Sequence, residues 1–251
     1  MVMFDNNTFN EPVVFIRGNP GRPGPKVERR FLTALSPDKP KPLTDGSGRL
    51  QLAQSIASAG NPLTARVFVN RLWTTLCGQG LVDTPGDFGV RTAPPVNPAL
   101  LDYLAATFVE EGWSIKKLTR RILLTQAWQQ SSVARKEMEA RDPDNKLLWR
   151  QNRRKLEAEA VRDAVLAVSG KLDLTMGGPG VKNFTEAPGP QLTPALNYAG
   201  YDWNSAGAGR RSIYRYVWRG IADPFMEALD FPDLGLLSPQ RGFSASSLQA
   251  L

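Results

Sequence analysis

The chain contains no histidine among its 251 residues and a single cysteine, Cys77. The absence of imidazole excludes Ser-His-Asp and Cys-His catalytic arrangements within this chain, and it removes the most frequent protein ligand of haem and catalytic zinc. One cysteine forms neither an intrachain disulfide nor a paired-cysteine metal site. We therefore expect no haem, no transition metal and no other cofactor in this chain, and we interpret Cys77 as a core residue.

Long hydrophobic runs are also missing. No stretch approaches the roughly 18 apolar residues that cross a bilayer, so we expect no membrane span. The first ten residues lack the basic start and apolar core of a signal peptide. The composition, 41% hydrophobic and 22% charged, is that of a globular protein with a sizeable core. Lysine and arginine exceed aspartate and glutamate by 31 to 24, which gives a formal charge of +7.

Proline and glycine divide the chain into three parts. Residues 1–48 are predicted to form an extended proline-rich arm with one short strand at Val13–Ile16. Residues 49–170 are predicted to form a helical core. Residues 171–251 are predicted to be a loop-rich continuation of the same domain, in which Arg211–Trp218 alternates like a strand. The expected fold class is mainly α: an irregular multi-helix domain with one or two short strands and long Pro/Gly-rich loops.

Helical spacing of apolar residues begins near Leu50 and recurs in four longer segments. Two of these follow Asn-Pro pairs, which are favoured at helix starts because Asn caps and Pro suits the first turn. We predict that the four share one core through their apolar faces, which for the first of them includes Leu63, Val67, Leu72 and Leu76. Their predicted ranges are Leu63–Leu76, Pro98–Glu111, Ile115–Ala127 and Arg153–Val168.

Two segments concentrate polar residues beside apolar ones. In the first, Asn61–Trp73, we interpret the polar side chains as supports for neighbouring loops rather than as a binding face. In the second, Asn152–Ala164, we expect arginines to pair with carboxylates or loop carbonyls, with Arg71 as a further member. The candidate structural or binding cluster comprises Arg66, Asn70, Arg71, Trp73, Asp87, Arg153, Arg154, Glu157, Glu159, Arg162 and Asp163.

Two alternatives from other function classes stay open. A carbohydrate-active hydrolase would use two of Asp87, Glu157, Glu159 and Asp163 as acid and base. On a helix from Arg153, Glu157 and Glu159 would point to different sides, whereas Glu159 and Asp163 would share a face. A nucleic-acid-binding domain would use the basic helix face of Lys116, Lys117, Arg120 and Arg121. No aromatic residue interrupts that face, so nucleic acid is not the expected partner.

A family resemblance extends over most of the chain, from about Arg17 to the last residue. The sequence carries, in order, NPLTARVFVNRLW, GLVDTPGDFG, DPDNKLLWRQNRRKLEAEAVRDAVLAVSGKLD, MGGPG, RRSIY, FPD and SPQR. With these motifs it resembles the planctomycete cytochrome-c-associated domain of unknown function number 1553. Members often have histidines where this chain has Thr75, Leu76 and Asn97, and the resemblance supplies no catalytic residues.

The resemblance implies a C-terminal part of a large exported bacterial protein. Its partners would be the other domains of that protein, one cytochrome-c-like and a second uncharacterised. A polysaccharide or another cell-surface component is a further candidate partner. The implied location is extracytoplasmic, periplasmic or at the cell surface. We therefore expect a non-catalytic structural or interaction module, with the hydrolase and the nucleic-acid binder as alternatives.

Overall fold

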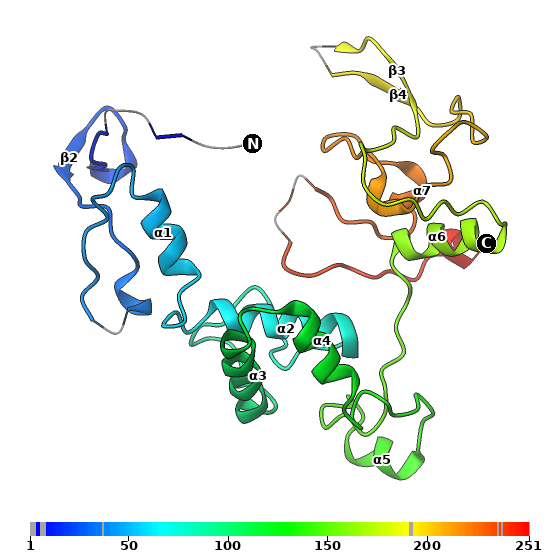
Figure 1. The fold of residues 1–251 in the computed structure, drawn as a ribbon, viewed down its shortest axis with the longest axis horizontal. Helices are drawn as coiled ribbons and strands as arrows, with labels where there is room; N and C mark the ends of the chain where they lie inside the picture. The colour runs from blue at the N-terminus through cyan, green and yellow to red at the C-terminus, as the bar shows by residue number, and fades with distance from the viewer. Residues whose placement is uncertain are drawn as a thin grey trace. The chain divides into compact units, whose positions relative to one another are not determined.

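The computed structural model describes residues 4–5, 9–36, 38–190, 193–234, 236 and 238–250. Within them the regular structure is mainly α-helical, with two short two-stranded sheets and long loops, which confirms the predicted fold class (Figure 1). The chain forms two compact units, Met1–Asn152 and Arg153–Leu251. The predicted division at residues 48 and 170 stays a prediction. Across the described ranges, no helix has the length and apolar character needed to cross a membrane.

The first unit begins with a β-hairpin. Strand β1 (Val13–Phe15) pairs antiparallel with β2 (Pro23–Lys26), with Val13 opposite Lys26 and Phe15 opposite Pro23. The strand predicted here is confirmed, although it ends one residue earlier, where a single 3-10 turn begins at Ile16. Strand β2 was not predicted, because two of its four residues are prolines. An edge strand tolerates proline where its backbone N–H would point away from the neighbouring strand.

Helix α1 (Arg49–Ile56) leads to three longer helices, α2 (Thr64–Cys77), α3 (Pro98–Glu110) and α4 (Ile115–Leu123). The start of α3 is capped by Asn97 Oδ1, which accepts from the backbone N–H of Leu100 at 3.0 Å. A short helix, α5 (Lys136–Arg141), follows α4 after a loop. Helix α4 ends at Leu123 rather than at the predicted Ala127.

Helices α2, α3 and α4 pack together around one core (Figure 1). The ring of Phe68 stacks on that of Phe108 at a centroid distance of 4.9 Å. The buried apolar stripe of α2 differs from the predicted one, because Leu72 and Leu76 are only partly buried where they pack against the core. The stripe consists of Ala65, Val69, Trp73 and Cys77, which confirms Cys77 as a core residue.

The DPDNKLLWRQN segment packs against the C-terminal end of α2. The carboxylate of Asp142 accepts from two backbone N–H groups of the following turn, at 2.9 and 2.8 Å. The indole N–H of Trp149 donates to the backbone carbonyl of Asp142 at 2.8 Å. The side-chain amide of Asn152 donates to the carbonyl of Cys77 at 2.9 Å. Side chains of this segment therefore satisfy carbonyls that the end of a helix leaves without partners.

The second unit is held together by few regular elements. Helix α6 (Ala158–Val168) contacts the 3-10 turn η4 (Ser212–Tyr214) and α7 (Pro224–Glu227). Strands β3 (Thr185–Ala187) and β4 (Ala195–Asn197) pair antiparallel, and α8 (Ser247–Ala250) lies near the end of the chain. The strand predicted over Arg211–Trp218 is wrong. That segment contains η4, followed by an isolated bridge between Val181 and Arg215.

Helix α6 also differs from the prediction in its start and its buried face. It begins at Ala158 rather than at Arg153, and Glu157 before it has an extended backbone. The predicted inward residues Leu156 and Val168 are 64% and 92% exposed. Helix α6 therefore does not join the core of α2, α3 and α4. Its own buried residues are Ala158 and Arg162.

Asn70 ties the loop after α2 to the helix. Its side chain is buried, its Oδ1 accepts from the N–H of Val82 at 2.9 Å, and its Nδ2 donates to the carbonyl of Val82 at 3.0 Å. Gly80 lies against this amide, and a Cβ there would come within 2.6 Å of the Val82 carbonyl oxygen. The sequence predicted that Asn70 supports a neighbouring loop, and the structure contains this contact.

We expect Asn70→Ala to lower the free energy of unfolding by about 2 to 5 kcal/mol, because it leaves the buried N–H and C=O of Val82 without partners. Urea denaturation measures the change. The neighbouring Arg71→Ala is the matched control, since its side chain is exposed and a surface substitution of this kind changes stability by less than about 0.5 kcal/mol. Equal stability of the two variants would contradict this role of Asn70.

Candidate functional site

The start of α6 meets an arginine from far along the chain. Arg241 donates from Nη1 to Glu159 Oε2 at 2.7 Å and from Nη2 to Glu159 Oε1 at 2.8 Å. The same Nη1 lies 3.6 Å from Glu157 Oε2. The prediction that Glu157 and Glu159 point to different sides is wrong, because Glu157 precedes the helix and its extended backbone directs both carboxylates to one guanidinium.

This contact sets the charge of Glu159. Partial burial alone would raise the pKa of this carboxyl, but the hydrogen bonds and attraction from Arg241 outweigh burial and hold its pKa below the ordinary value. The pKa of Arg241 is raised in turn, chiefly by its bond to Glu159. Glu159 is therefore ionised at neutral pH, the opposite of what a general acid requires.

One turn further along α6, Arg162 and Asp163 hold the loop that leads into η4. The buried guanidinium of Arg162 donates to the carbonyls of Ala208 at 2.8 Å and Arg210 at 2.9 Å. Asp163 Oδ1 accepts from both the backbone N–H and the hydroxyl of Ser212, each at 2.7 Å. The carboxylates of Glu159 and Asp163 thus have separate partners.

A second buried ion pair joins Arg215 to Asp223, whose side chains are only 7% and 13% exposed. The other carboxylate oxygen of Asp223 caps α7 by accepting from the N–H of Met226 at 3.1 Å. Burial, and then the nearby charge of Arg162, lower the pKa of Arg215 to about 10. Arg215 therefore remains protonated at neutral pH.

Beside this pair lies a cavity of about 430 Å³ within the second unit. Arg215 and Asp223 belong to its lining, together with acidic side chains and the carbonyl-bound Arg219. Its aromatic and apolar lining consists of Tyr198, Tyr216, Val217, Trp218, Ile221, Met226, Phe231, Pro232 and Leu234. We refer to it below as the aromatic cavity. A cavity of this size accommodates a small organic ligand.

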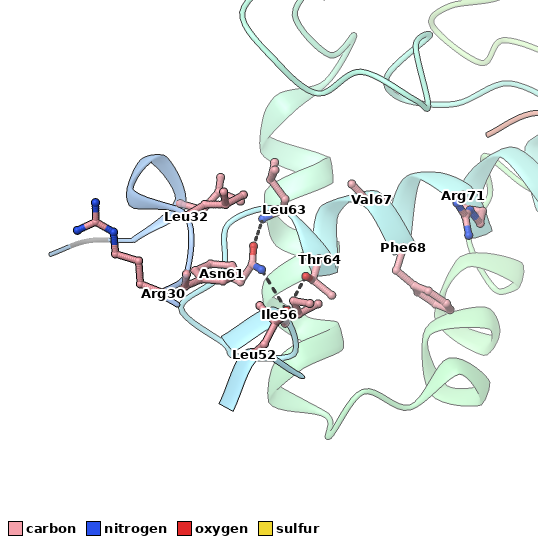
Figure 2. A pocket seen from close by; sticks show the side chains of 12 residues that line it. Arg30, Leu32, Leu52, Ile56, Asn61, Leu63, Thr64, Val67, Phe68 and Arg71 are labelled. Atoms are coloured by element: carbon pink, nitrogen blue, oxygen red, sulfur yellow. Dashed lines mark hydrogen bonds between the residues drawn. The ribbon is translucent and has the colours of Figure 1, made fainter. Parts of the chain in front are cut away.

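In the first unit, an apolar groove of about 580 Å³ lies between the N-terminal arm and helices α1 and α2 (Figure 2). Asn61 and Thr64 join the two helices by donating to the carbonyl of Ile56, at 3.1 and 2.6 Å. Arg30 and Arg71 lie toward opposite ends of the row of apolar side chains in this view. The apolar lining consists of Phe31, Leu32, Leu35, Leu52, Ile56, Leu63, Val67 and Phe68.

The predicted site residues of the first unit have different roles. Arg66 donates to Asp102 Oδ1 at 2.7 Å on the surface, and Trp73 is buried in the core. Asp87 accepts from the N–H of Gly89 at 2.8 Å and thereby stabilises a turn. Arg71 contributes to the groove described above.

Arg153 and Arg154 are both exposed. Arg153 has no partner within the part of the chain that the structure describes, so the expected contact with a carboxylate or carbonyl is not found for it. Guanidinium groups that do hold carboxylates or loops in this unit include those of Arg162, Arg210, Arg215, Arg219 and Arg241.

On the basic face of α4, the guanidinium of Arg121 is used inside the first unit. It lies 2.6 Å from Glu111 Oε1 and donates to the hydroxyl of Tyr103 at 3.1 Å. The bond to Glu111 is the chief reason why the pKa of Arg121 is raised. Among the described residues, no group of three or more acidic, cysteine or histidine side chains is arranged to hold a metal ion.

Comparison with known families places the chain. The sequence model of the family described as PSD1, protein of unknown function (DUF1553), matches residues 48–251. The chain belongs to this family. Neither the curated proteins nor the solved structures include a match to it.

Several of the residues that form the contacts above were absent from the candidates chosen from sequence. Ser212 belongs to the RRSIY motif of this DUF1553 chain, Arg241 to SPQR, and Phe231–Asp233 is the FPD motif in the lining of the aromatic cavity. In the sequence, these motifs indicated the family resemblance and were not interpreted as parts of a site. A polar residue inside each quoted motif was the signal that could have identified Ser212 and Arg241.

We expect Glu159→Gln to lower the free energy of unfolding by about 1.5 to 3 kcal/mol, because it removes two charge-assisted hydrogen bonds in a partly buried position. Glu157→Gln is the matched control. Its carboxylate is about half exposed and farther from Arg241, so its loss should cost less than about 1 kcal/mol. Thermal and urea denaturation measure both.

The stabilisation by Glu159 should depend on pH. Its pKa is lower in the folded chain than the ordinary value of 4.5, so its contribution is full above that value and is lost as the pH falls through the folded pKa. The difference in melting temperature between the wild type and Glu159→Gln should therefore shrink on acidification from pH 7. A difference that grew toward low pH would contradict the ion pair.

Proposed function

We propose that the chain is a non-catalytic structural or interaction module of a larger exported, cytochrome-c-associated bacterial protein. The non-catalytic part of the proposal rests on one observation: the candidate carboxylates already contact other groups of the chain. Glu157 and Glu159 face Arg241, Asp163 holds Ser212, and Asp87 closes a turn.

A hydrolase would need a different pKa for its acid and different contacts for its second carboxylate. A general acid requires a raised pKa, whereas that of Glu159 is lowered. The partner carboxylate must face the same substrate bond, but Asp163 accepts two hydrogen bonds from one loop residue. The charges near the start of α6 therefore favour a structural role over the carbohydrate-active hydrolase.

The interaction part is supported by the apolar groove. Helix α2 is apolar on two faces, one turned to the core and one, with Val67 and Phe68, lining the groove beside Leu63, the residue before the helix. The guanidinium groups of Arg30 and Arg71 have no partner among the described residues. We propose that an apolar segment bearing carboxylates, from another domain of the same protein, docks here, because its charges would complement these two arginines.

The proposed context follows the family resemblance. The other domains would be a cytochrome-c-like domain and a second uncharacterised one, with the haem held by the former and no cofactor in this chain. The proposed location is extracytoplasmic. A polysaccharide or another cell-surface component is a further proposed partner.

The non-catalytic assignment predicts that the chain releases no reducing ends from a panel of plant, fungal and bacterial polysaccharides. A reducing-sugar assay at neutral and mildly acidic pH measures this, with Glu159→Gln and Asp163→Asn tested beside the wild type. Release by the wild type that disappears in either variant would replace the module with the hydrolase.

The docking proposal predicts that reversing both groove charges, in Arg30→Glu/Arg71→Glu, weakens binding of the remaining domains of the parent protein by about tenfold or more. Isothermal titration calorimetry with those domains as a separate polypeptide measures the affinity. The control is Lys116→Glu/Lys117→Glu, an equal charge change on exposed positions of α4. Equal weakening by both double variants would show a nonspecific charge effect and overturn the groove as the docking surface.

A further inference from the structure

The aromatic cavity of the second unit combines flat apolar walls with hydrogen-bonding groups. Tyr198, Tyr216 and Trp218 line it, and so do the carboxylates of Asp223 and Glu227. We propose that this cavity is a binding site for a neutral carbohydrate, with the sugar ring against the aromatic side chains and its hydroxyl groups donating to the carboxylate of Glu227. The proposal extends the function proposed above, since it names a ligand class for an interaction module.

The aromatic walls are held in place from behind. The ring of the buried Phe184 packs edge-on against Tyr198 and Tyr216, at centroid distances of 5.4 and 6.1 Å. The rings of Tyr216 and Trp218 lie 6.1 Å apart with an angle of 47° between their planes. A sugar ring presents C–H groups on its faces and hydroxyl groups around its edge, and amphipathic aromatic side chains suit such a ligand.

The charges of the lining favour a neutral ligand over an anion. Arg215 is neutralised by Asp223, and Arg219 donates from Nε and Nη2 to the carbonyl of Leu234, at 3.1 and 3.0 Å. Glu227, by contrast, is an exposed carboxylate without a partner among the described residues. The lining as a whole carries two arginines against three acidic residues, Asp223, Glu227 and Asp233, so a phosphate or carboxylate ligand would meet an excess of acidic side chains. Hydroxyl groups are donors that Glu227 can accept from.

The same contacts make the cavity pre-organised. The Arg215–Asp223 pair is buried at its wall, and Asp223 also caps α7, the helix that carries Glu227. The bonds from Arg219 to Leu234 hold the segment that follows α7 beside the segment that carries Trp218. A site whose groups are already in place loses little conformational entropy on binding.

The test is calorimetric titration of the whole chain with neutral oligosaccharides derived from cellulose, xylan, mannan, starch and chitin, and with uncharged and acidic pairs such as galactan and polygalacturonate fragments. We expect at least one neutral oligosaccharide to bind, and the acidic member of a pair to bind more weakly. Trp218→Ala should weaken binding by about tenfold or more, as expected for loss of a stacking surface. Glu227→Gln is a second, surface variant that retains the fold and should also weaken binding.

Trp203→Ala is the matched control, because Trp203 is half exposed in the same unit, packs on Tyr201 and does not line the cavity. Its affinity should stay within about twofold of the wild type. The proposal would be overturned if no oligosaccharide bound. It would also be overturned if Trp203→Ala and Trp218→Ala lost affinity equally while Glu227→Gln lost none. Binding followed by cleavage would confirm the ligand class and overturn the non-catalytic function. Absence of both binding and cleavage would overturn the ligand class and leave the non-catalytic function in place.

Discussion

The buried guanidinium of Arg162 organises the second unit. A charge in this position is stable only if its donors are satisfied, and the carbonyls of Ala208 and Arg210 together with the hydroxyl of Ser212 satisfy them. The loop must therefore wrap against α6. Asp163 completes the arrangement by accepting from Ser212, so two adjacent side chains of one helix hold a segment almost fifty residues away.

In the first unit, neutral side-chain amides hold loops against a helix in the same way. Asn70 on α2 pairs with both backbone groups of Val82, and Asn152 donates to the last turn of α2. A chain with long loops has many backbone N–H and C=O groups outside helices and sheets, and each buried one needs a partner. Polar side chains within the family motifs supply such partners, which gives a structural reason for the polar residues of these motifs.

The structural contacts of the polar side chains have a consequence for function. Carboxylates such as Glu159 and Asp163 hold an arginine and a loop, so their loss should affect stability first. The hollows of the two units are then the places to look for ligands. The apolar groove of the first unit has an arginine toward each end of its row of apolar side chains. The arginines that line the aromatic cavity of the second unit already hold a carboxylate and a carbonyl.

Local signals in the sequence were sufficient for most helices. Caps such as Asn97 and Ser114 act on backbone groups within the next turn, so they could be identified from neighbouring residues alone. The lack of histidine and the apolar setting of Cys77 likewise followed from the sequence.

Tertiary structure decided which face of α2 is buried, where α6 begins and what its carboxylates contact. Glu159 and Arg241 are 82 residues apart, and the bond between them depends on how the intervening loops fold rather than on helical spacing. The expected strand before Trp218 became a 3-10 turn because Ser212 is bound by Asp163, a contact that no local pattern contains. Helix starts depend on short-range hydrogen bonds, whereas the partners of buried charges are chosen by the whole fold.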